Sequence, residues 1–397
     1  MRKAFFASYW FWHCGEGFQT ILFTWYMVFY ARLSATEIGF YQSLQLFPFL
    51  FLTAIGGTLT DRIGARTSFA AATGLFALAL AGYGINAAGE VFSPWLFGAY
   101  CLASGILSAI SNPAIDTFIP EASPRPTEDN ALIAATVHNI AKLSGNIATL
   151  LLPVLSAPGG FAVNGALMAV SAALILWMPR RQPVARPTGR GLPLRRVMAH
   201  FRANPVSFDI LLGSAMLGLL VIPAFYVFKP LTFRLRFPDE GDLYALTGIV
   251  GWIGAILAAS LAVRLSPRIA RPGRVALGIW GAGALLTLSL LVVPGFAGYI
   301  AILFLLGANQ VGKALIYGRY LREAPTEDRG TLIGIDQTAF WGLATIGTMW
   351  LGWLVDRIGL ADAMILNTGA ILASVALLAL RRRISGIGRR SGDFPEA

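Results

Sequence analysis

The feature that most constrains this chain is a series of apolar stretches, each close to 20 residues long and nearly free of charged side chains. About 20 helical residues span the hydrocarbon core of a bilayer, where backbone groups must be satisfied within a helix or a closed barrel. The stretches lie at 8–30, 37–58, 67–87, 93–116, 131–153, 159–178, 206–228, 243–263, 274–293, 295–317, 330–353 and 361–380. We therefore predict an all-α integral membrane protein with twelve transmembrane helices.

The composition supports this prediction, since 56% of the 397 residues are hydrophobic and 13% are charged, with a mean hydropathy of +0.65. The start, Met1-Arg2-Lys3 before an apolar run, resembles a signal peptide. However, the run reaches Tyr30 without a small-residue cleavage site, so we expect a first spanning helix. Cys14 and Cys101 both fall within apolar runs, which favours neither a disulfide framework nor a metal site.

A polar, basic segment separates the sixth apolar stretch from the seventh. Residues 179–205 contain seven arginines and no acid, and they are rich in proline and glycine. This composition predicts a cytoplasmic linker with one amphipathic turn at Leu194–Phe201. The linker divides the chain into two six-helix bundles, 1–178 and 206–383, which are followed by a cytoplasmic tail, 384–397.

Positive charge is distributed asymmetrically between the predicted loops. With a cytoplasmic N-terminus, most of the 31 lysines and arginines fall in cytoplasmic loops, the linker and the tail, as the positive-inside rule requires. The net charge of +11 is spread between apolar runs and forms no single stripe, so it favours contact with membrane lipids over nucleic acid. We expect a monomer in a bacterial cytoplasmic membrane, with both termini in the cytoplasm.

Two short patterns occur twice. Pro126-Thr-Glu-Asp129 recurs as Pro325-Thr-Glu-Asp328, each copy preceding the fifth span of its half. Gly57-x-Leu-x-Asp-Arg-Ile-Gly64 recurs as Gly352-x-Leu-x-Asp-Arg-Ile-Gly359, after the second and the eleventh spans and on opposite sides of the predicted membrane. This relation is typical of inverted repeats nested in a transporter.

With twelve spans, a basic central loop and the pattern G-x-L-x-D-R-x-G-x-R at Gly57–Arg66, the chain resembles the major facilitator superfamily. The resemblance implies two six-helix bundles with nested inverted repeats, and a loop that acts as a gate. The acid of this loop, here Asp61, would interact with the N-terminal end of the eleventh span. The arginines of the loop would pair with acids at the cytoplasmic end of the fourth span, here Asp116 or Glu121. The predicted gating residues are Gly57, Asp61, Arg62, Gly64, Arg66, Asp116 and Glu121.

The fourth span carries a finer resemblance. Its Asn112-Pro113-Ala114, followed by Pro120, is similar to a bacterial exporter branch of the superfamily that includes multidrug and siderophore efflux proteins. That branch carries arginine and Gly-Pro early in the fifth span, where this chain has Lys142 and Gly145. The resemblance implies efflux of an amphipathic organic solute, such as a drug or siderophore, by alternating access.

Ionisable side chains inside the apolar spans are candidate transport residues, because charge in lipid is costly. Glu16 lies about two turns into the first span, and Lys142 lies about three turns into the fifth, one turn beyond His138. Since both charges lie at a similar depth, a Glu16–Lys142 pair is geometrically possible. The pair could couple transport to protons or bind substrate charge; the alternative is a purely structural ion pair.

The second half offers a similar pair. Asp336, near the start of the eleventh span, and Lys313, near the end of the tenth, are predicted at similar depths; alternatively Lys313 extends to the headgroups. Asn309 shares a helical face with Lys313, and Gln337 follows Asp336. The candidates for proton coupling or substrate binding are Glu16, His138, Lys142, Asn309, Lys313, Asp336 and Gln337.

The sequence carries no phosphate-binding loop, nucleotide fingerprint or catalytic triad. We therefore expect no enzyme activity and no cofactor, and an ion gradient as the energy source. The leading hypothesis is a secondary transporter that exchanges protons for a small-molecule substrate. The alternatives are a symporter that imports a small organic anion or nutrient, with His138, Lys142 and Lys313 as charge hosts, and a lipid-handling membrane protein.

Overall fold

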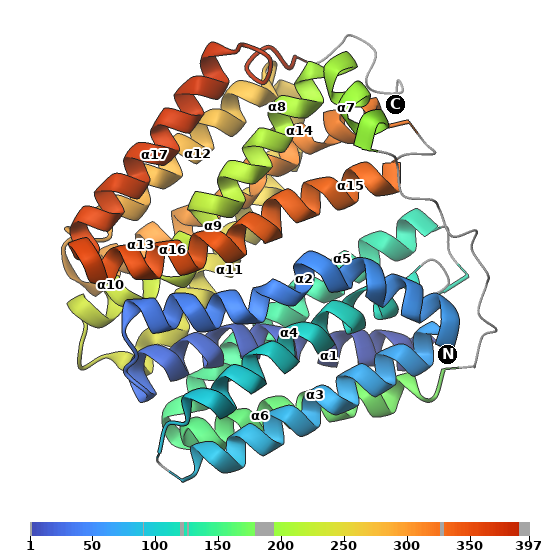
Figure 1. The fold of residues 1–397 in the computed structure, drawn as a ribbon, viewed down its shortest axis with the longest axis vertical. Coiled ribbons are helices and arrows are strands. Elements are labelled where there is room, and N and C mark those ends of the chain that lie inside the picture. The colour runs from blue at the N-terminus through green and yellow to red at the C-terminus, as the bar shows by residue number, and fades with distance from the viewer. Residues whose placement is uncertain are drawn as a thin grey trace. The chain divides into compact units, whose positions relative to one another are not determined.

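The computed structural model describes residues 2–89, 91–119, 123–124, 127–178, 194–325 and 329–388. Side chains are described throughout these ranges except at 2, 53–62, 127–129, 131–132, 194, 267 and 329–330. The described residues form helices and short connections, with no β-strand among them (Figure 1). The prediction of an all-α fold is confirmed.

The chain folds as two compact units, Met1–Gly189 with Phe233–Ile249 and Arg190–Thr232 with Val250–Ala397. Unit 1 contains α1 (Arg2–Trp25), η1 (Tyr26–Tyr30), α2 (Ala35–Ile63), α3 (Ala65–Ala87), α4 (Pro94–Asp116), α5 (Thr127–Ala148), η3 (Thr149–Leu151), α6 (Leu152–Ile175) and η5 (Gly241–Tyr244). Unit 2 contains α7 (Leu194–Ala203), α8 (Pro205–Met216), η4 (Leu217–Val221), α9 (Ile222–Tyr226), η6 (Ser266–Arg268), α12 (Pro272–Ser289), α13 (Gly295–Leu306), α14 (Asn309–Glu323), α15 (Arg329–Gln337), η7 (Thr338–Gly342), α16 (Leu343–Ile358) and α17 (Leu360–Leu380). Two helices, α10 (Phe228–Arg236) and α11 (Ala245–Leu265), have residues in both units.

Each of the twelve predicted spans coincides with one helix or with consecutive helices, and α7 occupies the place of the predicted amphipathic turn. The predicted boundaries of the bundles, linker and tail stay predictions. Among the described residues, eight helical stretches are long and apolar enough to cross a membrane by length and composition alone: Ala65–Ala87, Pro94–Asp116, Ile133–Ile175, Pro205–Arg236, Gly241–Leu265, Gly295–Glu323, Thr331–Ile358 and Leu360–Leu380.

Two helix starts follow directly from local sequence. At the start of α2, the backbone N–H of Ser34 donates to Glu37 Oε2 (2.9 Å), and the N–H of Glu37 donates to Ser34 Oγ (3.2 Å). This reciprocal capping box satisfies two amides that have no partner inside the helix. At α4, Ser93 Oγ accepts from the N–H of Leu96, and Pro94 occupies the first turn, where its missing N–H costs nothing.

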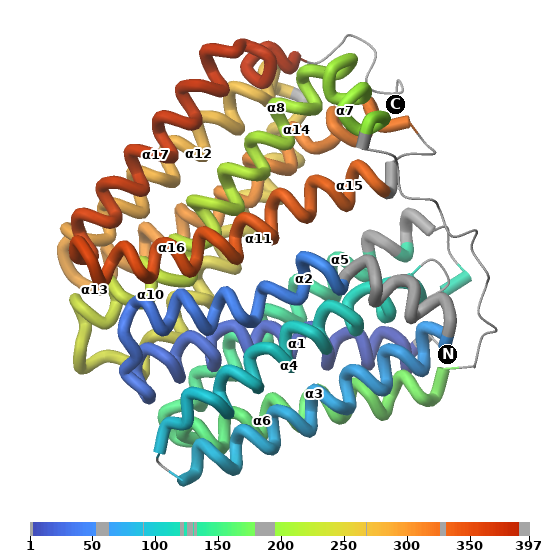
Figure 2. The backbone as a smooth tube through the Cα atoms, in the orientation of Figure 1, coloured from blue at the N-terminus to red at the C-terminus, as the bar shows by residue number. Residues whose placement is uncertain are grey.

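The helices depart from regular α-geometry in places that hydropathy alone does not reveal. The break expected between the fifth and sixth spans is a kink inside α6, where Ser156 adopts φ 54° between Pro153 and Pro158. Short π-helical segments form the end of the first span as η1 and interrupt the seventh and eleventh spans as η4 and η7. In Figure 2 the tube follows the eleventh span as one continuous run through such a segment. At η4 and η7 the helix is widened or bent without ending the span.

The two copies of the repeated loop share a turn geometry. Gly64 ends the α2–α3 connection with φ 86° and ψ 140°, and Gly359 joins α16 to α17 with φ 89° and ψ 159°. Positive φ values of this kind favour glycine, because a Cβ atom would clash with the backbone. The repeated sequence therefore encodes the same tight turn in both units, which supports the predicted equivalence of these helix pairs.

Helices α1 and α5 pack with their backbones in contact. A Cβ atom on Gly17 would overlap the carbonyl oxygen of Lys142, and one on Gly145 would overlap the carbonyl oxygen of Cys14. Small residues allow such close approach between membrane helices. In unit 2, Gly218 of η4 lies in the same way against the carbonyl of Phe340 in η7. The close approach of α1 and α5 fixes the distance between the ionisable side chains that these helices carry.

Gly145→Ala should lower the stability of the protein by about 1–3 kcal/mol, the usual cost of overpacking a close contact. The matched control is Gly82→Ala, also inside a helix, where an added Cβ meets nothing within 4 Å. Because alanine has the higher helix propensity, the control should be neutral or slightly stabilising. Thermal unfolding of the two purified variants measures the difference; equal midpoints would contradict the close contact.

Candidate functional site

Glu16 of α1 is the centre of a buried polar cluster in unit 1. Its Oε2 atom lies 2.7 Å from His13 Nδ1 and 3.5 Å from Lys142 Nζ of α5. Its Oε1 atom accepts a hydrogen bond from Asn112 Nδ2 of α4 (3.3 Å), and Asn112 Oδ1 accepts from Trp12 Nε1 (2.9 Å). The structure therefore brings Glu16 and Lys142 together and adds partners from α1 and α4. Both oxygens of this partly buried carboxylate therefore have partners.

Two imidazole rings continue the cluster towards a pocket. The ring centroids of His13 and His138 lie 4.2 Å apart, and Tyr9 packs edge-on against His13 at 4.3 Å. His13 Nε2 is buried and has no hydrogen-bond partner among the described residues.

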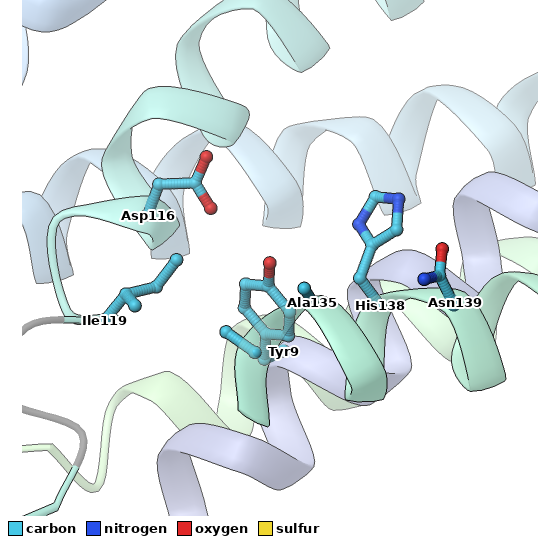
Figure 3. A pocket seen from close by; sticks show the side chains of 7 residues that line it. Tyr9, Asp116, Ile119, Ala135, His138 and Asn139 are labelled. Carbon is cyan, nitrogen blue, oxygen red and sulfur yellow. The ribbon is translucent and has the colours of Figure 1, made fainter. Parts of the chain in front are cut away.

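The pocket next to these histidines has a volume of about 300 Å³. It is lined by Tyr9, Asp116, Ile119, Ala134, Ala135, His138 and Asn139. Figure 3 shows the carboxylate of Asp116, the hydroxyl of Tyr9 and the imidazole of His138 around one space. Asp116, predicted as a gate residue, thus also borders the cluster that contains Glu16.

Asp336 is the centre of a second cluster, in unit 2. Its side chain is 0% exposed, and Oδ2 accepts a charged hydrogen bond from Lys313 Nζ at 2.7 Å. Ser214 Oγ of α8 donates to the other carboxylate oxygen at 2.5 Å. The Lys313 ammonium lies 4.4 Å from the ring centroid of Phe340 and 5.2 Å from that of Tyr317, which are cation–π distances. Lys313 therefore points towards Asp336 and these rings within unit 2.

The two uncharged candidates of unit 2 lie outside this cluster's described contacts. The side chain of Asn309 packs against Gly283 of α12. Gln337 is exposed, although it follows the buried Asp336. Their assignment to substrate binding stays a prediction.

The predicted gate is described only in part. The side chains of Gly57, Asp61 and Arg62, and all of Glu121, lie outside the described residues. Arg66 donates to the backbone carbonyl of Leu176, next to the end of α6, a partner that the sequence did not suggest. The predicted pairing of the loop with Asp116 or Glu121 therefore stays a prediction.

Sequence reasoning missed several polar residues that the fold places at functional positions. Ser214 completes the Asp336 cluster and was not singled out, because uncharged polar side chains in spans are common and cost little. Asn112 was noted in the Asn-Pro-Ala motif, but its contact with Glu16 was not predicted. Arg234, at the end of α10, donates to the carbonyls of Val28 (3.2 Å) and Leu33 (3.0 Å), next to η1. Beside these contacts the ring of Phe29 packs on Phe233 and Tyr244.

Asp209 at the start of α8 was also missed. It is 0% exposed and pairs with Arg381 (2.8 Å) and Arg383 (3.4 Å), just beyond α17. Asp209 lies near the start of the predicted seventh span, so the sequence did not suggest that its charge is buried. Within the part of the chain that the structure describes, no group of three or more His, Cys, Asp or Glu side chains has a metal-binding arrangement.

Comparisons with known proteins identify the family. The family model described as Major Facilitator Superfamily matches residues 5–346. No curated protein sequence matches the chain significantly. Among solved structures, the nucleoside transporter NupG is 12% identical with a TM-score of 0.77, covering 96% of this chain and 98% of that chain.

Two further solved structures are similar. A D-xylose-proton symporter is 15% identical with a TM-score of 0.71 and coverage of 94% of this chain and 95% of that one. The POT family transporter PepTSo is 15% identical with a TM-score of 0.73 and coverage of 97% and 98%. Identities this low show a shared fold. Together with the family match over most of its length, they show that this chain belongs to the major facilitator superfamily and is a membrane transporter.

Proposed function

We propose that the protein is a proton-coupled secondary transporter that exports an amphipathic organic solute by alternating access. The observation that carries the proposal is the environment of Glu16, an intramembrane acid bonded to His13, Lys142 and Asn112 beside a pocket. Ionisable groups at this depth are costly and are typical of proton relays and substrate pathways. Asn112 belongs to the Asn-Pro-Ala sequence on which the exporter resemblance rests, so this resemblance and the cluster share a residue.

Protonation of Glu16 would weaken its attraction to Lys142 and so change the energy of the cluster. A proton arriving from the pocket would reach the carboxylate by way of His13, whose Nδ1 lies 2.7 Å from Glu16 Oε2. Substrate charge would compete for the same partners, which couples the two binding events through one group. In unit 2, Asp336 and Lys313 form a second pair able to respond in the same way.

The loop at Gly57–Arg66 is proposed as the cytoplasmic gate. A carboxylate at Asp61 near a helix N-terminus would gain roughly 0.3–1 kcal/mol, or more if partly buried. A contribution of this size biases two conformations without locking either one. We place the protein in a bacterial cytoplasmic membrane, as a monomer with both termini in the cytoplasm, on the basis of its charge distribution.

Import by proton symport is the second candidate. Lys142 and Lys313 are positive hosts that would suit a small organic anion, and His138, one turn before Lys142 on α5, could share that role. A proton symporter is also among the proteins with this fold. The exporter is favoured because both lysines are engaged by acids, which leaves no unpaired positive host in either cluster.

Proteoliposomes with an imposed pH gradient test the direction. An exporter that exchanges protons for solute should accumulate amphipathic test compounds, such as lipophilic dyes and siderophores, only in vesicles with an acidic interior. In vesicles with an acidic interior the proton gradient points outward, so protons leave the vesicle as solute enters. Accumulation driven by an acidic exterior would establish symport instead. Vesicles with the gradient collapsed by an ionophore are the control.

A further inference from the structure

A cluster of exposed arginines lies at one end of unit 2. It consists of Arg264 at the end of α11, Arg268 in η6, Arg271 and Arg274 at the start of α12, and Arg382 beyond α17. None of these guanidinium groups has a hydrogen-bond or ion-pair partner among the described residues. We refer to these five residues as the arginine corner.

Tertiary contacts assemble the arginine corner from two distant parts of the chain. Helix α17 packs against both α12 and α8 (Figure 1). After α17 the chain turns at Arg382, with φ 59°, and the carbonyl of Ile384 packs on the backbone of Gly273. The side chain of Ile384 is 0% exposed. This buried contact holds Arg382 beside the connection from α11 to α12.

Among the described residues, the acids near the corner are engaged by other partners. Asp209 is already paired with Arg381 and Arg383, and Glu323 lies 2.6 Å from Arg319 and accepts a further hydrogen bond from Ser207. The five corner arginines therefore keep their positive charge. Arginine presents planar N–H donors that suit phosphate oxygens.

Apolar surface adjoins the positive charge. Leu261, Val263 and Leu265 of α11 are 55%, 75% and 37% exposed, and Val275 of α12 is 38% exposed. Helix α11 belongs to a stretch that is long and apolar enough to cross a membrane, and these apolar side chains adjoin the arginines along the sequence. A ligand that fits both surfaces has an anionic head and hydrocarbon chains. A free phosphate ion would use only the first surface.

We propose that the arginine corner is a binding site for an anionic phospholipid, whose phosphate contacts the guanidinium groups and whose acyl chains lie along α11 and α12. Clusters of four or more basic residues at the cytoplasmic end of spans attract anionic lipids by about fivefold in affinity per residue. The convergence of the α11–α12 connection with the residues after α17 makes this corner a built site, beyond the general positive charge of cytoplasmic loops.

Native mass spectrometry of the purified full-length protein, titrated with phosphatidylglycerol, phosphatidylcholine or inorganic phosphate, tests the site. The wild type should bind phosphatidylglycerol and neither of the other two. The triple variant R268Q/R271Q/R274Q should bind phosphatidylglycerol about tenfold or more weakly. The matched control R195Q/R196Q/R202Q removes three exposed arginines from α7 and should retain wild-type binding.

Equal losses in both triple variants would overturn the site, since general surface charge would then explain the binding. Binding of inorganic phosphate with equal affinity would also overturn it, because no lipid chain would be involved. The variant R268K/R271K/R274K keeps the charge and should recover most of the binding. Thermal unfolding of each variant shows whether it is folded. If the triple variant does not fold, the single variant Arg271→Gln replaces it, and it should still bind phosphatidylglycerol more weakly than the wild type.

Discussion

Replacing Glu16 by glutamine should abolish proton-driven transport, lowering the rate by about 100-fold, while the protein remains folded. Glutamine has nearly the same shape and can still accept from Asn112, but it cannot carry a proton on and off. Its neighbour Lys142 loses its counter-charge at 3.5 Å, so the link between proton and solute is lost. Gradient-driven uptake into proteoliposomes measures the effect.

Exchange of labelled for unlabelled solute at equal pH gives the internal comparison. This exchange needs no net proton movement, so the Glu16→Gln variant should retain it. Asp239→Asn, at an exposed acid in the loop after α10, is the matched control and should leave both activities unchanged. If Glu16→Gln kept full gradient-driven transport, the coupling role would pass to Asp336, and Asp336→Asn would show the loss instead.

Lys313→Met should destabilise the protein by about 3–5 kcal/mol, the usual cost of leaving a buried charge without its partner. Asp336 is 0% exposed and would lose its charged partner while it keeps the hydrogen bond from Ser214. The double variant Lys313→Met/Asp336→Asn removes both charges and should recover most of the loss. Thermal unfolding of the wild type, both single variants and the double variant completes the cycle.

Arg322→Met is the matched control for this cycle. It removes a basic side chain from the same helix, α14, at an exposed position. Its effect should stay within about 0.5 kcal/mol, as for other surface substitutions. If Lys313→Met were as mild as this control, the pair with Asp336 would contribute little to stability, and Lys313 would be free for a substrate.

Most of the helical layout was predictable because lipid imposes one requirement on every span. A backbone without water must satisfy its own hydrogen bonds, so apolar stretches of about 20 residues become helices whatever their detailed sequence. The kink at Ser156 and the π-segments escaped prediction because they arise from proline placement and packing, which hydropathy does not register. The turn at Gly64 was predictable because the same sequence pattern recurs at Gly359.

The two acid–lysine pairs were predictable because charges are rare within apolar spans. Glu16 and Lys142, and likewise Asp336 and Lys313, fall at matching depths, so helix rise alone suggested each pair. The remaining partners depend on which helix faces pack together. The contact between Asn112 and Glu16 requires α4 to approach α1, and one sequence gives no direct signal for that approach.

The ion pair between Asp209 and Arg381 has a practical consequence for handling the protein. These residues are 172 positions apart. The buried carboxylate in the seventh span therefore has no guanidinium partner until the residues after the last span have been synthesised. A shortened version that stops at Leu380 would leave a buried carboxylate with no guanidinium group to neutralise it. Affinity tags and reporter fusions should therefore be attached beyond Gly388, where they leave the ion pair between Asp209 and Arg381 intact.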